Sequence, residues 1–180
     1  MDFQFCPFDG ERLEARPGRN EGRPSCTRCR FVHYANPVPA VAVFIKRGTE
    51  VLLVRRAIEP EKGKWDIPGG FVQWDEKVEQ TVVRECEEEL SVIVDDIKFL
   101  GSIPDVYGPF KTQTINLCFL AAITCGELFP ASDVDRLEWF SVDRPPALAF
   151  AHQQQAIALL REYIAKTSAN QQRGLPTNRV

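Results

Sequence analysis

Acidic residues crowd onto one short stretch of the chain, between Gly70 and Val92. Glu76 is followed by the pair Arg84-Glu85 and then by the pair Glu88-Glu89. Carboxylates this close together repel one another unless positive charge lies among them. Hard oxygen ligands suit Mg²⁺ or Mn²⁺, which usually complete their coordination with water and substrate phosphates. The stretch therefore predicts a metal-dependent enzyme that acts on a phosphate compound.

The residues from Lys77 to Leu90 have the spacing of a helix that would position these acids. Apolar side chains recur at steps of three, four and seven and share one face. Glu85, Glu88 and Glu89 fall within an arc of about 100° beside that face. The helix can therefore pack on a core while it turns three carboxylates toward one cleft. The apolar positions are Val78, Val82, Val83, Cys86 and Leu90.

A solvated acidic helix face is the plain alternative, because charge runs are common on protein surfaces. Two features argue against it. The acids lie in the last two turns, where the helix dipole disfavours negative charge. Few Lys or Arg residues lie four positions away to compensate. A bound cation accounts for this placement better than solvent does.

The spacing resembles the signature of the Nudix hydrolases. That signature is a glycine, five residues, Glu, seven residues, Arg-Glu, an apolar residue, one residue, Glu-Glu, one residue, Gly and an apolar residue. Every charged position matches here, but Cys86 takes the bulky aliphatic place and Ser91 replaces the final glycine. A glycine just past a helix often adopts a left-handed conformation. We therefore expect Ser91 to cost about 1 kcal/mol or to shift the turn.

The resemblance implies hydrolysis of a nucleoside diphosphate linked to another moiety. It implies that Glu85, Glu88 and Glu89 hold Mg²⁺ or Mn²⁺ on the pyrophosphate, that Glu76 supports the site from the loop, and that Arg84 orients the glutamates. Positioning and electrostatics carry phosphoryl transfer, so little covalent chemistry is asked of the protein. In some family members the general base lies on a later loop, and four acids are open for that role: Glu127, Asp133, Asp135 and Glu138.

The residues just before the helix read Trp65-Asp66-Ile67-Pro68-Gly69-Gly70. Ile67 precedes a proline and is expected to be extended. Gly69 and Gly70 then allow a sharp turn and a close approach of the backbone to a ligand. Before this helix, the pair resembles the loop that opens the Nudix metal site.

The amino-terminal segment carries two cysteine turns separated by polar residues. Cys6 begins the first turn, and Cys26 and Cys29 frame the second. This is a zinc-ribbon spacing, except that Asp9 stands where a complete site would have cysteine. Carboxylate is an accepted zinc ligand, so three cysteines and one aspartate predict structural Zn²⁺, with a metal-free ribbon as the alternative. His33 is a further candidate ligand, although a histidine between Val32 and Tyr34 favours a structural role.

The net charge and the cysteine content indicate which partners and which cellular compartment to expect. The net charge of −3 leaves no electrostatic footprint for nucleic acid, so a scaffold or dimerisation role is expected for the ribbon. No apolar run approaches membrane-spanning length. Six cysteines without a signal peptide predict a reducing, cytoplasmic location. We expect Cys86, Cys118 and Cys125 to lie in the core.

The remaining pattern predicts an α+β fold: a Nudix α/β/α sandwich with a mixed sheet, preceded by the small ribbon module. We expect the ribbon at residues 1–36, the Nudix domain at 37–166 and a flexible tail at 167–180. Gly48 lies in the turn of an expected hairpin. The expected strands are Val38–Lys46, Val51–Arg56, Phe99–Ile103, Thr114–Thr124 and Leu137–Ser141, and the last helix is Ala151–Lys166.

The ribbon followed by this domain resembles a Nudix group that acts on ADP-ribose, FAD and NADH, in which many members are homodimers. The NADH enzymes of that group carry a proline- and tryptophan-rich signature after the helix, which Pro104–Phe110 does not match. ADP-ribose or FAD, with release of AMP, is therefore the expected substrate. NADH and a non-catalytic nucleotide sensor are the alternatives. Tyr107 or Phe110 would stack on a ring, and Arg55 or Arg56 would meet phosphate.

Overall fold

The computed structural model describes residues 3–15 and 20–173. The chain divides into two compact units, Met1–Pro37 and Val38–Val180, and the division falls one residue after the expected boundary. In the part of the chain described, no helix combines the length and the apolar character needed to cross a membrane.

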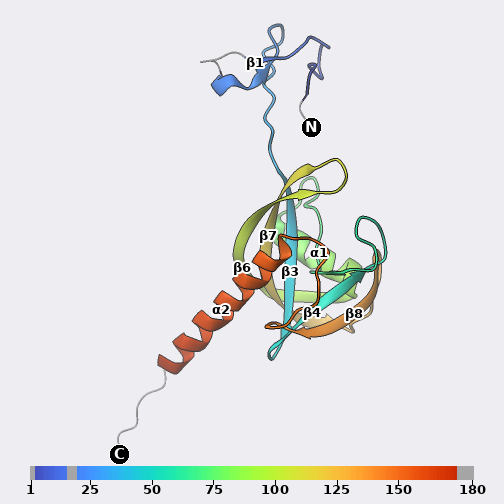
Figure 1. Ribbon diagram of the computed structural model, residues 1–180, viewed down its shortest axis with the longest axis vertical. Helices are drawn as coiled ribbons and strands as arrows, with labels where there is room; N and C mark the ends of the chain where they lie inside the picture. The colour runs from blue at the N-terminus through green and yellow to red at the C-terminus, as the bar shows by residue number, and fades with distance from the viewer. Residues whose placement is uncertain (1–2, 16–19, 174–180) are drawn as a thin grey trace, which may run out of the picture. The chain divides into compact units, whose positions relative to one another are not determined.

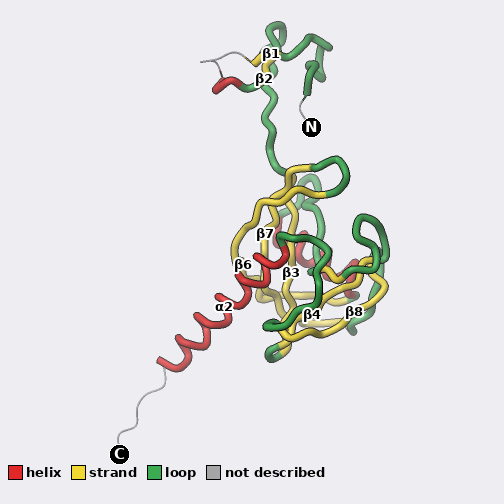
Figure 2. Tube along the Cα trace, viewed as in Figure 1, coloured by secondary structure: helices red, strands yellow, loops and turns green. Residues whose placement is uncertain are grey.

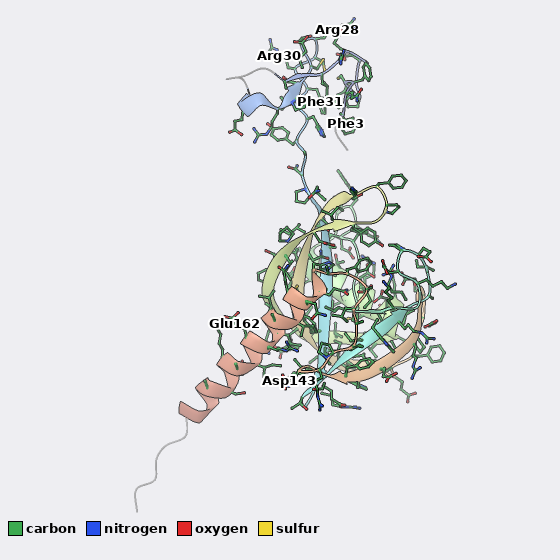
Figure 3. The ribbon with its side chains drawn as sticks, in the orientation of Figure 1. Phe3, Arg28, Arg30, Phe31, Asp143 and Glu162 are labelled. Atoms are coloured by element: carbon green, nitrogen blue, oxygen red, sulfur yellow. The ribbon has the colours of Figure 1, made fainter. Side chains whose placement is uncertain are left out.

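The first unit is built from two turns and very short pieces of regular structure. The strands β1 (Glu14–Ala15) and β2 (Pro24–Ser25) pair antiparallel around the 3-10 turn η1 (Asn20–Gly22). Its apolar cluster is small and includes the two buried cysteines. Such a segment has too little core to be stable by burial alone. The cluster consists of Cys6, Leu13 and Cys26, with Phe31 packed against it. Figure 3 labels the Phe31 side chain in this unit.

The second unit contains a six-stranded mixed sheet in the order β5-β4-β3-β7-β6, with β8 paired to β4. The two central strands, β3 and β7, are parallel over eight residue pairs, and the other pairs are antiparallel. The strands are β3 (Val38–Arg47), β4 (Glu50–Arg56), β5 (Trp65–Asp66), β6 (Val92–Tyr107), β7 (Thr112–Gly126) and β8 (Val134–Ser141).

Helices α1 (Val78–Leu90) and α2 (Gln153–Arg173) lie on opposite faces of this sheet, as Figures 1 and 2 show. The α1 core contains Val82, Cys86 and Leu90, which are fully buried. The α2 core contains Ala156, Ile157 and Leu160. The expected α+β sandwich with a mixed sheet is confirmed.

Strand alternation divides the side chains of the sheet between these two cores. On β3, Val41 and Val43 pack toward α1, whereas Ala42 and Phe44 pack toward α2. On β7, Cys118 belongs to the α2 core. Because successive side chains of a strand point to opposite faces, residues 114 and 116 share the face of Cys118. The α2 face of β7 is therefore apolar at residue 118 and polar at residues 114 and 116.

The largest differences from the sequence prediction are two element boundaries and the exposure of one cysteine. Strand β6 starts at Val92, directly after α1, rather than at Phe99. Helix α2 continues to Arg173 through residues expected to form a tail, and residues 174–180 lie outside the described part. Cys125, expected in the core, is exposed because it lies at the end of β7, where residues 122–126 are all exposed.

The expected hairpin between β3 and β4 forms, but its two strands pair only next to the turn. Beyond Lys46 and Val51, β4 separates from β3 and pairs with β8 and β5 instead. This separation opens the region in which the loop before α1 docks on β3.

Candidate active site

Arg84 donates hydrogen bonds to three of the carboxylates in the acidic stretch. Its Nε and Nη2 donate to the two carboxylate oxygens of Glu76 at 2.8 and 3.0 Å. Its Nη1 donates to Glu85 Oε1 at 2.8 Å and to Glu88 Oε2 at 3.0 Å. Its Nη2 also donates to the backbone oxygen of Phe71 at 3.0 Å. Paired, charge-assisted hydrogen bonds of this kind fix orientation as well as charge, so one guanidinium holds three carboxylates and the preceding loop.

The glycine loop is docked directly on β3. Val41 N donates to Gly70 O at 2.8 Å. Gly69 N donates to Glu89 Oε2 at 3.0 Å. A Cβ atom on Gly69 would lie 2.1 Å from Val41 O. The close approach requires glycine there, and it places a backbone donor on the third carboxylate.

Each of the three helix glutamates has one oxygen bonded and one oxygen free of hydrogen bonds to described residues. The bonded atoms are Glu85 Oε1, Glu88 Oε2 and Glu89 Oε2. Glu85 and Glu89 are buried, and all three side chains line the same cavity. Three oriented carboxylates with free oxygens are a donor set that fits Mg²⁺ or Mn²⁺.

Burial and charge shift the pKa values of these acids in opposite directions. Desolvation raises the pKa of Glu85 and raises that of Glu89 well above its ordinary value. The nearby charge of Asp133 adds to both shifts. Glu76 differs, because its hydrogen bonds from Arg84 lower its pKa from 4.5 to about 2. Glu76 is thus a permanently charged partner of Arg84, whereas the buried pair gains from a cation.

The cavity has a volume of about 410 Å³ and extends from these carboxylates to the start of α2. Of the four acids open for the role of general base, Asp133 lines it. Asp135 is bound to Arg55 at 2.7 Å instead, and Glu138 to Arg136. Glu127 is exposed and is not part of the cavity wall.

The two strand-end arginines have different positions. Arg55, predicted to bind substrate, does not line the cavity, because its side chain points outward to Asp135. Arg56 points to the opposite side of β4 and does line the cavity. Its Nη1 donates to Asp66 Oδ2 at 2.7 Å, and its guanidinium lies 5.2 Å from the Phe150 ring centroid.

Aromatic side chains form one wall of the cavity. Tyr107 lines it, with its ring centroid 5.5 Å from that of Phe150 and 5.4 Å from that of Phe71. Phe110, the other predicted stacking residue, lies in an adjoining apolar hollow of about 320 Å³ that also includes Phe71 and Tyr107. The Phe110 side chain is 75% exposed. The structure thus brings Tyr107 to the site and leaves Phe110 at its margin.

Sequence reasoning missed a set of polar residues at the α2 end of the cavity. Asp66 is buried and accepts hydrogen bonds from Arg56, Gln153 and the backbone of Ile67. The period-two pattern of β7, which is polar at residues 114 and 116 among apolar neighbours, is a local signal for two members of this set, although it does not show what they would meet in the fold. The remaining residues of the set are Asp105, Thr114, Asn116, His152 and Gln153.

In the first unit, the structure brings together the four predicted zinc ligands. The ligand atoms of Cys6, Asp9, Cys26 and Cys29 all lie within 4.8 Å of one another. The Sγ atoms of Cys6 and Cys29 are 3.4 Å apart, and Cys26 Sγ is 3.4 Å from Asp9 Oδ2. His33 is not part of this cluster and packs edge-on against Phe3. The donor set of three thiols and one carboxylate fits Zn²⁺.

The α/β/α fold and the helix-borne glutamates agree with the arrangement that the sequence resemblance implies. The chain belongs to the Nudix family, because the model described as the NUDIX domain matches residues 36–162. The resemblance found in the sequence is therefore confirmed.

Curated relatives carry two kinds of name. The NAD-capped RNA hydrolase NudC of Pseudomonas aeruginosa is 34% identical over 176 residues, which cover 96% of this chain and 60% of the relative. The ADP-ribose pyrophosphatase of Methanocaldococcus jannaschii is 32% identical over 131 residues, which cover 73% of this chain and 75% of the relative. The chain thus spans about 60% of the length of the NudC relative.

Solved structures are similar over the same region. A NUDIX hydrolase from Nitrosomonas europaea superposes with a TM-score of 0.67 at 28% identity, covering 91% of this chain and 92% of that one. The NUDIX domain of Shewanella oneidensis NrtR, solved with ADP ribose, gives a TM-score of 0.58 at 27% identity and covers 73% of this chain and 90% of that one.

Proposed function

We propose that the chain hydrolyses the pyrophosphate bond of a nucleoside diphosphate linked to another moiety, and that ADP-ribose or FAD is the substrate and AMP a product. The observation that carries the proposal is that Glu85, Glu88 and Glu89 line one cavity, and that each keeps one carboxylate oxygen free of hydrogen bonds to described residues. Membership in the Nudix family and the ADP-ribose pyrophosphatase relative support it.

Glu85, Glu88 and Glu89 are the residues that would hold Mg²⁺ or Mn²⁺. When bound there, such ions neutralise phosphate charge and make a water molecule more acidic. Arg84 and the backbone amide of Gly69 keep the carboxylates in place, since each glutamate is tied by one oxygen. The carboxylates are therefore already ordered before the metal and the substrate bind, so no binding energy is lost in ordering them.

Asp133 is the general base in this proposal. It lines the cavity close enough to Glu85 and Glu89 to raise their pKa values, whereas Asp135 is neutralised by Arg55. A carboxylate at that position accepts the proton of the attacking water. Asp133→Asn is expected to lower kcat by about a hundredfold or more, at little cost in KM. An unchanged kcat would assign the base elsewhere.

NADH-type dinucleotides are the second candidate. The proline- and tryptophan-rich signature of NADH enzymes is missing at residues 104–110. The NudC relatives nevertheless favour a nicotinamide dinucleotide, because the name of each refers to an NAD-capped substrate. The two substrate groups share an ADP half, so they differ in the group beyond the second phosphate.

A nucleotide-binding domain without activity is the alternative of another class, and the ADP ribose bound to the NrtR domain is the observation that favours it. A protein that only senses a nucleotide has no need of a complete carboxylate set. All charged positions of the Nudix signature are present here. We therefore favour catalysis over sensing.

The test is product analysis with purified protein in Mg²⁺ and in Mn²⁺. ADP-ribose, FAD, NADH, NAD and nucleoside triphosphates are supplied separately, and AMP is quantified by chromatography. Release of AMP from ADP-ribose or FAD at least tenfold faster than from the others supports the proposal. Preferred cleavage of NADH or NAD would support the second candidate. Nucleotide binding without turnover of any compound would contradict catalysis.

The matched variants are Glu89→Gln and Glu87→Gln, which remove one charge each from the same helix. Glu89 is buried against the cavity, whereas Glu87 is exposed and does not line it. We expect the first change to abolish AMP release and the second to leave it within about twofold of the unmodified chain. Equal activity of both variants would exclude the carboxylate set as the catalytic site.

A further inference from the structure

Two polar side chains of β7, at the α2 end of the cavity, have no hydrogen-bond partner among the described residues. Thr114 Oγ1 is fully enclosed and unpaired, and the Thr114 residue is 3% exposed. Asn116 is 9% exposed, and no described residue bonds its side-chain amide. Both line the cavity, two residues apart on the same face of β7. Leaving buried polar groups unpaired costs free energy in most proteins, so such groups call for a ligand.

The surroundings of these two residues select the kind of ligand. Ala40 and Ala42, on the neighbouring strand β3, also line the cavity and leave space above the sheet. Tyr107 and Phe150 add aromatic surface at the same end. A flat ring that stacks on aromatic side chains and bonds through its edge fits both features.

We propose that this end of the cavity is a base-binding subsite that recognises adenine through Asn116, with Thr114 as a second hydrogen-bonding group. An asparagine amide offers one donor and one acceptor side by side. Adenine presents the complement, an amino donor next to a ring-nitrogen acceptor. Asn116 is thus a specificity-determining residue for the nucleoside half of the substrate, an inference that rests on the proposed function.

The subsite is separate from the residues that hold the pyrophosphate. Asn116 and Thr114 lie on β7, whereas the glutamates lie on α1 and contact the glycine loop. Asp105 and His152 border the subsite, with His152 Nδ1 2.8 Å from Asp105 Oδ2. These two side chains face each other, and Asn116 and Thr114 remain available to a base.

The test uses nucleotides that the enzyme does not hydrolyse, so it does not depend on turnover. Binding of AMP, of purine riboside 5′-monophosphate (which lacks the amino group) and of nicotinamide mononucleotide is measured by calorimetry in Mg²⁺. We expect AMP to bind about tenfold more tightly than the amino-free analogue, because one buried hydrogen bond is lost. Equal affinities for these two, or tighter binding of nicotinamide mononucleotide, would overturn the proposal.

Variants assign the discrimination to a residue. Asn116→Ala is expected to remove the preference for AMP over the analogue. Gln113→Ala, an exposed change on the same strand, is expected to keep it. A retained preference in Asn116→Ala would rule out the amide as the reader of the base. Thermal denaturation checks that each variant is folded before its binding is compared.

Thr114→Val provides a readout that a purely structural role would not give. Valine has the shape of threonine without the unpaired hydroxyl, so the melting temperature of the free protein is expected to rise by a few degrees. AMP affinity is expected to fall several-fold in the same variant. A fall in melting temperature would mean that the hydroxyl is satisfied in the free protein, for example by buried water, and would remove Thr114 from the subsite. Absence of AMP release with intact AMP selectivity would refute the proposed function and leave the subsite standing.

Discussion

Gly70 faces Glu85 so closely that a Cβ atom on Gly70 would lie 2.3 Å from Glu85 Oε1. The backbone of Gly70 therefore forms the wall against which this glutamate rests. Arg84 Nη1 donates a hydrogen bond to the same oxygen at 2.8 Å. The position of the Glu85 carboxylate thus depends both on the absence of a side chain at Gly70 and on the charge of Arg84.

Gly70→Ala is expected to displace the Glu85 carboxylate and to lower kcat by about a hundredfold, because misplacement of a site group by about 1 Å has effects of this order. Steady-state kinetics with ADP-ribose in Mg²⁺ measures the change. The double variant Gly70→Ala/Glu85→Asp has a shorter acid, which leaves room for the added methyl group. Its kcat is expected to be higher than the product of the two single-variant effects would give. Strict additivity of the two effects would contradict direct contact.

Glu76→Gln is expected to destabilise the protein in a pH-dependent way. The Glu76 pKa is lowered from 4.5 to about 2 by Arg84, so its charge stabilises the folded state fully above pH 4.5. This contribution is lost as the pH falls through about 2. Urea unfolding at several pH values should therefore show the largest difference between the unmodified chain and the variant above pH 4.5. A difference that grows toward acidic pH would have the wrong sign for this interaction.

Ser91→Gly is expected to stabilise the protein by about 1 kcal/mol. Ser91 ends α1 with a φ of 61° and a ψ of 30°, the left-handed conformation that favours glycine. Its Oγ donates to Phe129 O at 3.3 Å on the exposed surface, which offsets only part of that cost. Chemical denaturation measures the change. The comparison variant Ser91→Ala loses the hydroxyl but keeps the strain, so it should be less stable than the unmodified chain.

Metal analysis of the purified protein is expected to find one tightly held Zn²⁺ per chain. Asp9→Cys completes a four-thiolate site and should make zinc harder to remove by a chelator, because soft thiolates suit this ion. Cys26→Ser should release it and melt the first unit. Zinc at full occupancy in Cys26→Ser would show that the metal is bound elsewhere.

The carboxylate helix could be predicted from the sequence because its ligands lie within a few turns of one another. Helical geometry alone brings Glu85, Glu88 and Glu89 together. Arg84 is positioned by contacts with these acids and with the loop that directly precedes the helix. The left-handed conformation at Ser91 also follows from local sequence, since the signature has glycine there. The four predicted zinc ligands lie together in the structure, and each of the two turns that carry them is a local feature of the sequence.

The polar end of the cavity could not be predicted, since its residues come from distant parts of the chain. Asp66, Asn116 and His152 meet only when β5, β7 and the start of α2 are in place. Arg55 and Arg56 could not be told apart as phosphate-binding residues without knowledge of which face of β4 each residue occupies. A shift of one residue in a strand exchanges the faces that the two side chains occupy. Cys125 was assigned to the core because its apolar neighbours do not reveal which end of a long strand extends past the cover of a helix.

The parallel pairing of β3 with β7 has a consequence for how the site comes into existence. The glycine loop docks on β3, and α1 lies in the segment that connects β3 to β7. Parallel strands so far apart along the chain pair late, because loop-closure entropy opposes contacts of large sequence separation. A growing chain that has emerged only as far as α1 therefore carries all three glutamates. It still lacks β7, the strand that pairs with β3, on which the glycine loop docks. The proposed activity should therefore appear in a single step during synthesis, after β7 and the later Asp133 have left the ribosome, with no partly active intermediate before it.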